Sequence, residues 1–175
     1  YANEDLMNNW QKGMQLNSYA FNTDTQKEIV LPSNSLKSGA YIIEFSCKDK
    51  NDNLIGFKKS FIATSSNDQT PKPATFAYFH IDKNTAKPNE TVNIQIGSSM
   101  SNTKAILEIA FKGKLIDKKM ITLNNEIKTI PIAIKENYIG GIEVNYVLVN
   151  KNRLYSKTTF ITVPYEDKSL KIEWL

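Results

Sequence analysis

Residues 141–149 read Gly-Ile-Glu-Val-Asn-Tyr-Val-Leu-Val, and this stretch decides the fold class. Its large apolar side chains at positions 142, 144, 146 and 148 alternate with Glu143 and Asn145. Because side chains of a β-strand point to opposite faces in turn, this period of two predicts a strand with one face in a core and one in water. Residues 91–97, Thr-Val-Asn-Ile-Gln-Ile-Gly, show the same alternation.

The same period, broken by turn residues about every ten positions, runs through most of the chain and predicts an all-β protein of antiparallel β-sandwiches. Pro131 predicts either an edge strand or a bulge, since proline cannot donate to a β-ladder, and we expect the strand at 126–134 to be an edge. Leu6, Met7 and Trp10 have helical spacing and predict one or two helical turns within 4–12. Strands are predicted at 14–21, 27–31, 40–48 and 54–63, and then at 75–82, 91–97, 103–111, 114–123, 126–134, 141–149 and 153–163.

A run without large apolar side chains, Thr-Ser-Ser-Asn-Asp-Gln-Thr-Pro-Lys-Pro at 64–73, divides the pattern. We predict a partial β domain at 1–66, a linker at 67–73 and a seven-stranded, immunoglobulin-like sandwich at 74–165. Residues 166–175 contain Leu-Lys-Ile-Glu-Trp-Leu, which we interpret as the truncated start of a following domain. We therefore expect this chain to be a segment of a longer, multi-module protein.

Charge and composition argue against nucleic-acid binding and against a membrane-spanning helix. The 175 residues include 22 Lys and Arg against 18 Asp and Glu, for a net charge of +4. Arg153 is the only arginine and the lysines are scattered, so we interpret them as a solvated surface rather than a nucleic-acid site. No apolar run approaches the roughly 20 residues of a membrane-spanning helix, and we expect any export signal to lie outside these residues.

Residues that could carry catalysis or bind a metal are few. Cys47 and His80 are the only residues of their types, which excludes a disulfide framework and a zinc site built from these ligands. His80 is the sole candidate general base, but it lies in a predicted strand, which favours a structural role. The alternation of Tyr41, Ile43, Phe45 and Cys47 predicts that this face, Cys47 included, lies in a core, as an inert thiol.

Three further motifs have a functional and a structural interpretation. Residues 49–53, Asp-Lys-Asn-Asp-Asn, begin like a calcium loop, but Leu54 and Ser60 occupy the places of the required Gly and Glu, so we predict a polar hairpin loop. Asn89 lies in a glycosylation-type triplet that is a common chance match. Tyr165 and Trp174 are either a sugar platform or, as we favour, contacts between domains. We predict no catalytic, cofactor or metal-binding residues and no cofactor.

Three stretches together resemble the alpha-2-macroglobulin family of bacteria, in particular of the Bacteroidetes type. Residues 165–173 after Thr162-Val163-Pro164 are similar to the join between consecutive macroglobulin-like domains of that family. Residues 79–92 resemble its domain-opening strand and its turn of Pro-Gly followed by Glu or Asp, with Asn89 in place of the glycine. Residues 36–56 resemble its closing hairpin.

The resemblance implies tandem macroglobulin-like sandwiches of a cell-envelope protein that traps proteases. The partners would be neighbouring domains of the same chain and, through the full-length protein, proteases. Some family members carry a Cys-x-Glu-Gln thioester, but Cys47 is followed by Lys48-Asp49-Lys50, so no thioester is carried over. We expect a non-catalytic structural segment of a protease inhibitor, located in the cell envelope. The alternative is an immunoglobulin-like adhesive or glycan-binding module of a bacterial surface protein.

Overall fold

The computed structural model describes residue 7 and residues 9–22, 24–30 and 36–165. Two compact units divide the chain, unit 1 over 1–68 and unit 2 over 69–175, and each is described by itself. Met7 is helical, but the rest of the predicted helical turn lies mainly outside the described residues, as does the expected domain start at 166–175. Almost all regular structure is β, in antiparallel sheets, as the alternation predicted.

Unit 1 is built on one long β-hairpin. Strand β1 (Gly39–Lys48) pairs with β2 (Leu54–Ala63) along its whole length. The connecting turn is held by the Asp49 carboxylate, whose Oδ1 accepts hydrogen bonds from the backbone N–H groups of Asn51 at 2.7 Å and Asn53 at 2.9 Å. This is an Asx-type turn, which explains why a polar run connects two apolar strands here.

The strands predicted at 14–21 and 27–31 are wrong. Residues 14–21 and 27–30 have no regular structure, and position 31 lies outside the described residues. Between them Asn22 makes a turn, accepting backbone hydrogen bonds from Thr25 and Gln26. A strand exists only when a second strand satisfies its backbone groups, and among the described residues these segments have no such partner. Alternation alone could not show this.

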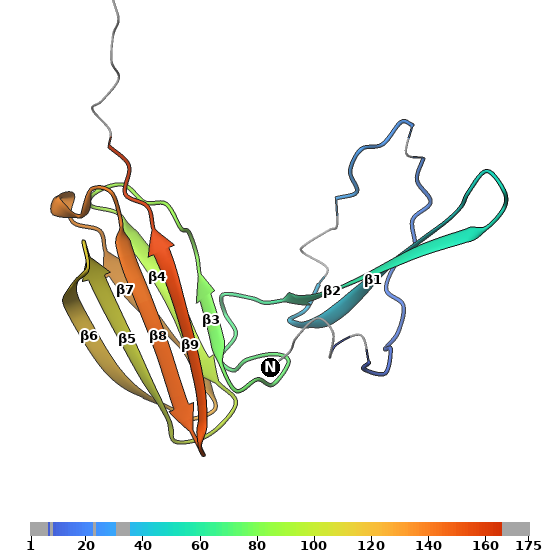
Figure 1. The fold of residues 1–175 in the computed structure, drawn as a ribbon. Helices are drawn as coiled ribbons and strands as arrows, with labels where there is room; N and C mark the ends of the chain where they lie inside the picture. Colours follow the sequence, from blue (N-terminus) through green and yellow to red (C-terminus); the bar gives the residue numbers. More distant parts are fainter. Residues whose placement is uncertain (1–6, 8, 23, 31–35, 166–175) are drawn as a thin grey trace, which may run out of the picture. The chain divides into compact units, whose positions relative to one another are not determined.

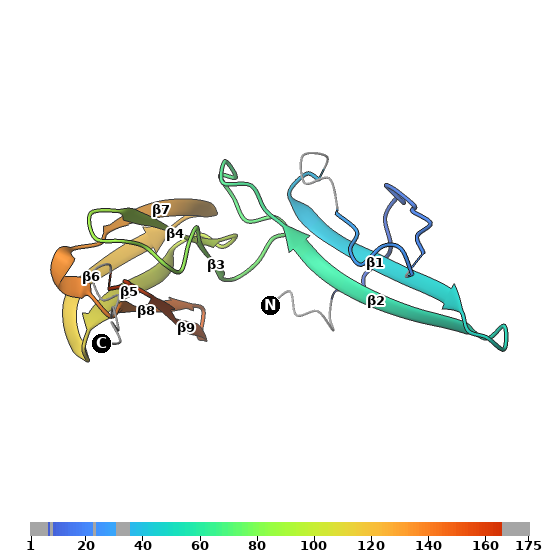
Figure 2. The same cartoon turned by 90° about the horizontal axis from the view of Figure 1, so that it is seen from above.

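Unit 2 is a sandwich of two layers of sheet (Figures 1 and 2). One sheet has three strands and the other has four. The three-stranded sheet has the order β3-β4-β7, with β3 (Tyr78–Ile81), β4 (Thr91–Ser98) and β7 (Glu126–Ala133). The four-stranded sheet has the order β6-β5-β8-β9, with β5 (Thr103–Phe111), β6 (Lys114–Leu123), β8 (Ile142–Asn150) and β9 (Arg153–Ile161). All seven strands were predicted, and η2 (Glu136–Tyr138) adds one turn of 3-10 helix.

The core of unit 2 fills the space between the two sheets. It takes the inward residues of both layers, because each strand alternates between the core and the outer face. Residues 69–75 also belong to this unit. The Gln69 carbonyl accepts a hydrogen bond from the Ile127 N–H, and the Thr75 carbonyl accepts one from the Ser99 N–H. Part of the predicted linker is therefore hydrogen-bonded to the sandwich. The largest fully buried side chains of this core are Val92, Ile94, Ile96, Leu107, Leu123, Ile134, Ile142, Val144, Tyr146, Leu148, Ile161 and Val163.

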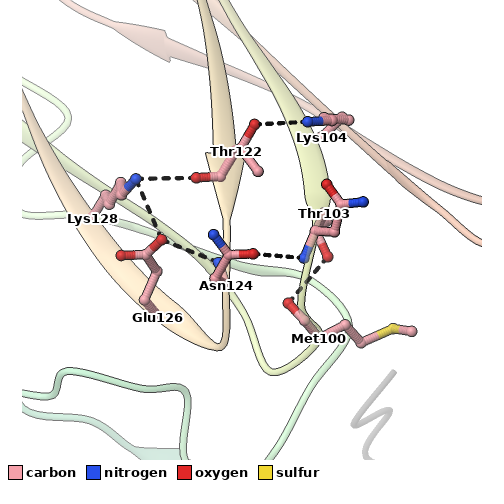
Figure 3. Close-up of polar contacts among 8 residues, drawn as sticks. Met100, Thr103, Lys104, Thr122, Asn124, Glu126 and Lys128 are labelled. Carbon is pink, nitrogen blue, oxygen red and sulfur yellow. Dashed lines mark hydrogen bonds and ion pairs between the residues drawn. The ribbon is translucent and has the colours of Figure 1, made fainter.

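Basic side chains span the two open sides of the sandwich. On one side the Arg153 guanidinium lies 4.7 Å from the centre of the Phe76 ring, and Lys157 Nζ lies 5.1 Å from that of Phe79. On the other side Lys128 Nζ of β7 donates to the Thr122 carbonyl of β6 at 3.0 Å, which links the two sheets (Figure 3). A cation over an aromatic face is attractive, so these contacts cover apolar surface and join the layers.

Each edge of the sandwich carries a feature that opposes pairing with another strand. Strand β3 has only four residues, and β7 carries Pro131, as the sequence predicted for an edge. On β9 the inward-facing residues include Arg153 and Lys157, and on β6 Lys119 lies opposite the buried Leu107. Short edges, prolines and inward-facing charges all hinder edge-to-edge association. Contacts with other chains are therefore expected on the faces of this unit.

Candidate functional site

The two residues weighed as catalytic candidates, His80 and Cys47, lie in different units. His80 is exposed on β3 and lies opposite Gln95 of β4 in the sheet. Cys47 lies in unit 1 on β1, so the two residue types that could combine as nucleophile and base are on separate units. Within the described part of the chain, no three His, Cys, Asp or Glu side chains are grouped as metal ligands would be.

Cys47 is exposed, and the prediction that it lies in a core is wrong. The predicted face itself exists: Tyr41 lies opposite Phe61, Phe45 opposite Phe57 and Cys47 opposite Ile55. What failed is the inference from a shared face to a buried one. Toward the hairpin turn no described residue covers this face sufficiently to bury Cys47.

We call this surface the aromatic face of the hairpin. The Tyr41 and Phe61 rings stack with centroids 5.5 Å apart, and the Phe45 and Phe57 rings lie 6.0 Å apart. Phe21 packs edge-on against Phe45 at 6.3 Å. Phe57 nevertheless keeps 58% of its surface exposed, so the face is apolar and open. Its full membership is Tyr41, Ile43, Phe45, Cys47, Ile55, Phe57, Lys59 and Phe61.

The opposite face of the hairpin carries a charged contact beside a shallow hollow lined by Met7, Trp10 and Ser60. The Glu44 carboxylate receives Lys12 Nζ at 2.7 Å and Lys58 Nζ at 3.1 Å. Hydrogen bonds from these two ammonium groups hold the pKa of Glu44 below its ordinary value of 4.5. The hollow is open to solvent, and Glu44 is neutralised by its partners, so this arrangement fastens residues 10–13 to the hairpin.

The remaining sequence candidates have structural surroundings. Asp49 uses both carboxylate oxygens within its own turn, with Asn53 Nδ2 donating to Oδ2 at 3.1 Å, and hydrogen bonds from Asn51 and Asn53 lower its pKa. Tyr165 is exposed, and Trp174 lies outside the described residues. Asn89 is exposed in a turn with φ of 68°.

The turn that contains Asn89 is stabilised by a backbone hydrogen bond and by the Glu90 side chain. Glu90 N–H donates to the Lys87 carbonyl at 3.1 Å, which closes a four-residue turn with Pro88 and Asn89 at its centre. The Glu90 side chain accepts from the Lys87 N–H at 3.1 Å and pairs with Lys83 Nζ at 2.7 Å, and these contacts lower its pKa. A positive φ at the third residue of a four-residue turn, directly after a proline, is typical of a type II turn, and Gly or Asn is favoured there.

The buried hydroxyl of Tyr146 is a feature that the sequence did not single out. The residue is fully buried between the sheets, with its ring 5.6 Å from that of Phe79 and 5.9 Å from that of Tyr155. Its Oη has no hydrogen-bond partner among the residues that the structure describes, and burial, aided by Tyr155, raises the pKa of this phenol. A neutral, inaccessible hydroxyl cannot act as an acid or a nucleophile here, so its role is packing.

Comparison with known proteins adds no assignment: no protein-family model matches the chain, and no curated protein matches it. Among the residues that the structure describes, no helix is long and apolar enough to span a membrane. The described surfaces that are open to a partner include the aromatic face of the hairpin and the outer faces of the sandwich.

Proposed function

We propose that this chain is a non-catalytic structural segment of a bacterial alpha-2-macroglobulin-like protease inhibitor, located in the cell envelope. In such a protein, β-sandwich modules form a frame, and the frame encloses the protease after cleavage. The contribution of this segment is its rigid sandwich and the faces that it presents to neighbouring domains, with no residue acting on the protease chemically.

The observation that carries the proposal is the turn at Lys87–Glu90. The resemblance to the family rested partly on a Pro-Gly-Glu turn in which Asn89 replaces the glycine. Asn89 has φ of 68°, a conformation that glycine adopts freely and asparagine tolerates better than most residues. Asn89 therefore has a backbone conformation that a glycine at this place in a turn adopts readily, which supports the proposed resemblance.

The surfaces of the two units add support. The aromatic face exposes large apolar side chains, which in multi-module proteins are covered by adjacent domains. Edges that resist strand pairing suit a module that packs against neighbours through its faces.

The test uses the full-length gene product that contains this chain. It is treated with substoichiometric protease, and the protease is then assayed on a small peptide and on a large protein substrate. Retained peptide cleavage with lost protein cleavage is the expected result, because an enclosed protease still admits small molecules. Unchanged cleavage of both substrates contradicts the proposal.

A second candidate, a glycan-binding module, gains one observation: Phe21, Phe45 and Phe57 form an exposed aromatic cluster. Sugar sites combine rings with precisely placed polar groups, whereas this cluster is bordered by Cys47 and Ile55 on its own face. Retardation of the chain in gels containing soluble polysaccharide, lost in Phe57→Ala, would favour this alternative. Equal mobility of both proteins with and without polysaccharide would remove it.

A further inference from the structure

The hairpin of unit 1 directs part of the β2 backbone away from β1. Asp49 N–H donates to the Asn53 carbonyl at 2.9 Å, so these two residues form a hydrogen-bonded pair at the turn. Opposite residues of an antiparallel ladder alternate between bonded and non-bonded pairs, so Leu54, Gly56 and Lys58 form non-bonded pairs with β1. Their N–H and C=O groups therefore point to the outer edge of β2. We call these three residues the open edge.

The open edge lacks the protection that the other strand edges have. Among the described residues, no backbone group outside the hairpin donates to it or accepts from it. Residues 13–21 pass round the β1 edge instead, since Lys12 and Phe21 contact opposite faces of β1 (Figure 2). The open edge contains no proline, and its one charged side chain, Lys58, is bound to Glu44 at 3.1 Å. It therefore remains able to pair with another strand.

The side chains beside the open edge differ between the two faces of the hairpin. On the aromatic face, Ile55 and Phe57 alternate with the open-edge residues and are 54% and 58% exposed. On the opposite face, the single Glu44 carboxylate is shared by Lys12 and Lys58, which leaves this group with a net positive charge. A strand beside β2 would thus meet apolar surface on one face and positive charge on the other.

We propose that the open edge binds an extended strand of another polypeptide, which adds to the hairpin as a third strand. Backbone N–H and C=O groups of that strand satisfy those of the open edge, which only a strand presents at the matching spacing. Its alternate side chains are apolar and cover Ile55 and Phe57, and an acidic side chain between them lies beside Lys58. In this mode, main-chain hydrogen bonds supply affinity and the alternate side chains supply specificity. The hairpin alone supports this contact, whatever the function of the whole protein.

A peptide with the sequence of residues 142–148 has the required chemistry and serves as the probe. Positions 142, 144, 146 and 148 are apolar, and Glu143 and Asn145 lie between them. In the folded chain this segment lies within the sandwich and does not compete. The fluorescently labelled peptide is titrated with the 175-residue chain, and its fluorescence anisotropy is expected to rise. With Glu143 beside Lys58, the N–H of Asn145 faces Gly56, so a peptide with Asn145→Pro should bind about tenfold more weakly or worse.

Two variants at one cross-strand pair provide the decisive comparison. Gly56→Pro removes an outward N–H of the open edge but no hydrogen bond of the hairpin, and it is expected to weaken peptide binding about tenfold or more. Ser46 lies directly opposite Gly56 and points its N–H to the β1 edge, so Ser46→Pro is the matched control and should leave binding unchanged. Phe57→Lys, at an exposed side chain, is expected to weaken binding through lost apolar contact. Circular dichroism checks that each variant keeps its β structure.

Several outcomes would overturn the proposal. They are a peptide whose anisotropy does not change up to millimolar chain, and a Gly56→Pro chain that binds it as the wild type does. Binding that is lost in Ser46→Pro and kept in Gly56→Pro would assign the contact to the β1 edge instead. Light scattering that shows a dimer of the chain, lost in Gly56→Pro, would assign the open edge to a second copy rather than to another polypeptide.

Discussion

Tyr146 is a residue at which burial and hydrogen bonding conflict. Its ring fills the space between the sheets, but its hydroxyl is buried with no hydrogen-bond partner in the described part of the chain. An unsatisfied buried polar group costs about 1–3 kcal/mol relative to a satisfied one, so the hydroxyl lowers the stability that the ring provides.

Tyr146→Phe is therefore expected to leave the free energy of unfolding unchanged or to raise it by up to about 1 kcal/mol. Chemical denaturation followed by circular dichroism measures this. The matched control is Tyr78→Phe, which removes a hydroxyl that donates to Gln95 Oε1 at 3.4 Å and should lower stability by about 0.5 kcal/mol. A clear loss of stability in Tyr146→Phe would show that the hydroxyl has a bonding partner, such as a buried water.

Asn89 illustrates a backbone requirement. Asn89→Gly should change the free energy of unfolding by less than about 0.5 kcal/mol, whereas Asn89→Val should lower it by about 1–2 kcal/mol, because a branched side chain clashes with the backbone at φ of 68°. Thermal or urea unfolding measures the free energies of unfolding of the two variants. Thr91→Val, at an exposed strand position nearby, is the control and should be nearly neutral. Equal stability of the Gly and Val variants would contradict the turn geometry.

Cys47 is expected to react with a thiol reagent in the native chain at a rate within about tenfold of the unfolded chain, because it is exposed. Absorbance during reaction with a disulfide reagent measures both rates. Labelling that begins only on unfolding would mean that something covers the aromatic face in solution.

At the scale of elements, the β1–β2 hairpin and residues 10–13 are joined through Glu44. The folded pKa of Glu44 lies below its ordinary value because Lys12 and Lys58 stabilise the carboxylate. A depressed carboxyl pKa contributes stability above the ordinary value, and this contribution is lost as the pH falls through the folded pKa.

Acidification below pH 4.5, the ordinary pKa of this carboxyl, is therefore expected to release residues 10–13 from the hairpin, and neutral pH to keep them bound. The indole N–H resonance of Trp10, which lines the adjacent hollow, reports the change by NMR. Glu44→Gln should show the released resonance position already at neutral pH. An acid shift of equal size in Glu44→Gln would mean that another group is responsible.

Strand prediction succeeded where two conditions held together, a period of two and a neighbouring strand of the same kind. Residues 114–123 were predicted and observed with the same bounds, and 91–97 differ from β4 by one residue. Residues 14–21 satisfied only the first condition, and the chain there is irregular.

At the scale of the molecule, the two units differ in what stabilises them. Unit 2 has a continuous core between two sheets, whereas the described core residues of unit 1 include only Met7 among apolar side chains. A two-stranded hairpin without a covered face is marginally stable in water.

Hydrogen exchange measured by mass spectrometry is expected to separate the units. Backbone amides of β1 and β2 should exchange at least about 100-fold faster than those of β4, β5 and β8, which corresponds to a difference of about 3 kcal/mol in opening free energy. If the amides of β1 and β2 exchange as slowly as those of β4, β5 and β8, the aromatic face is covered in solution. Faster exchange of β1 and β2 in Phe57→Lys would then show that the covering group contacts Phe57.

The sequence by itself determined the all-β class, the seven strands of the sandwich, its edge at Pro131 and which side chains share a face, because these follow from alternation and turn chemistry along the chain. Only the tertiary structure decided which faces are covered and which residues become neighbours across strands. Cys47 is exposed on a face predicted to be buried, and Ile106 meets Met120 and Val147 through strand pairing. The physical reason is that alternation orients a side chain relative to its own strand, whereas burial requires a second layer.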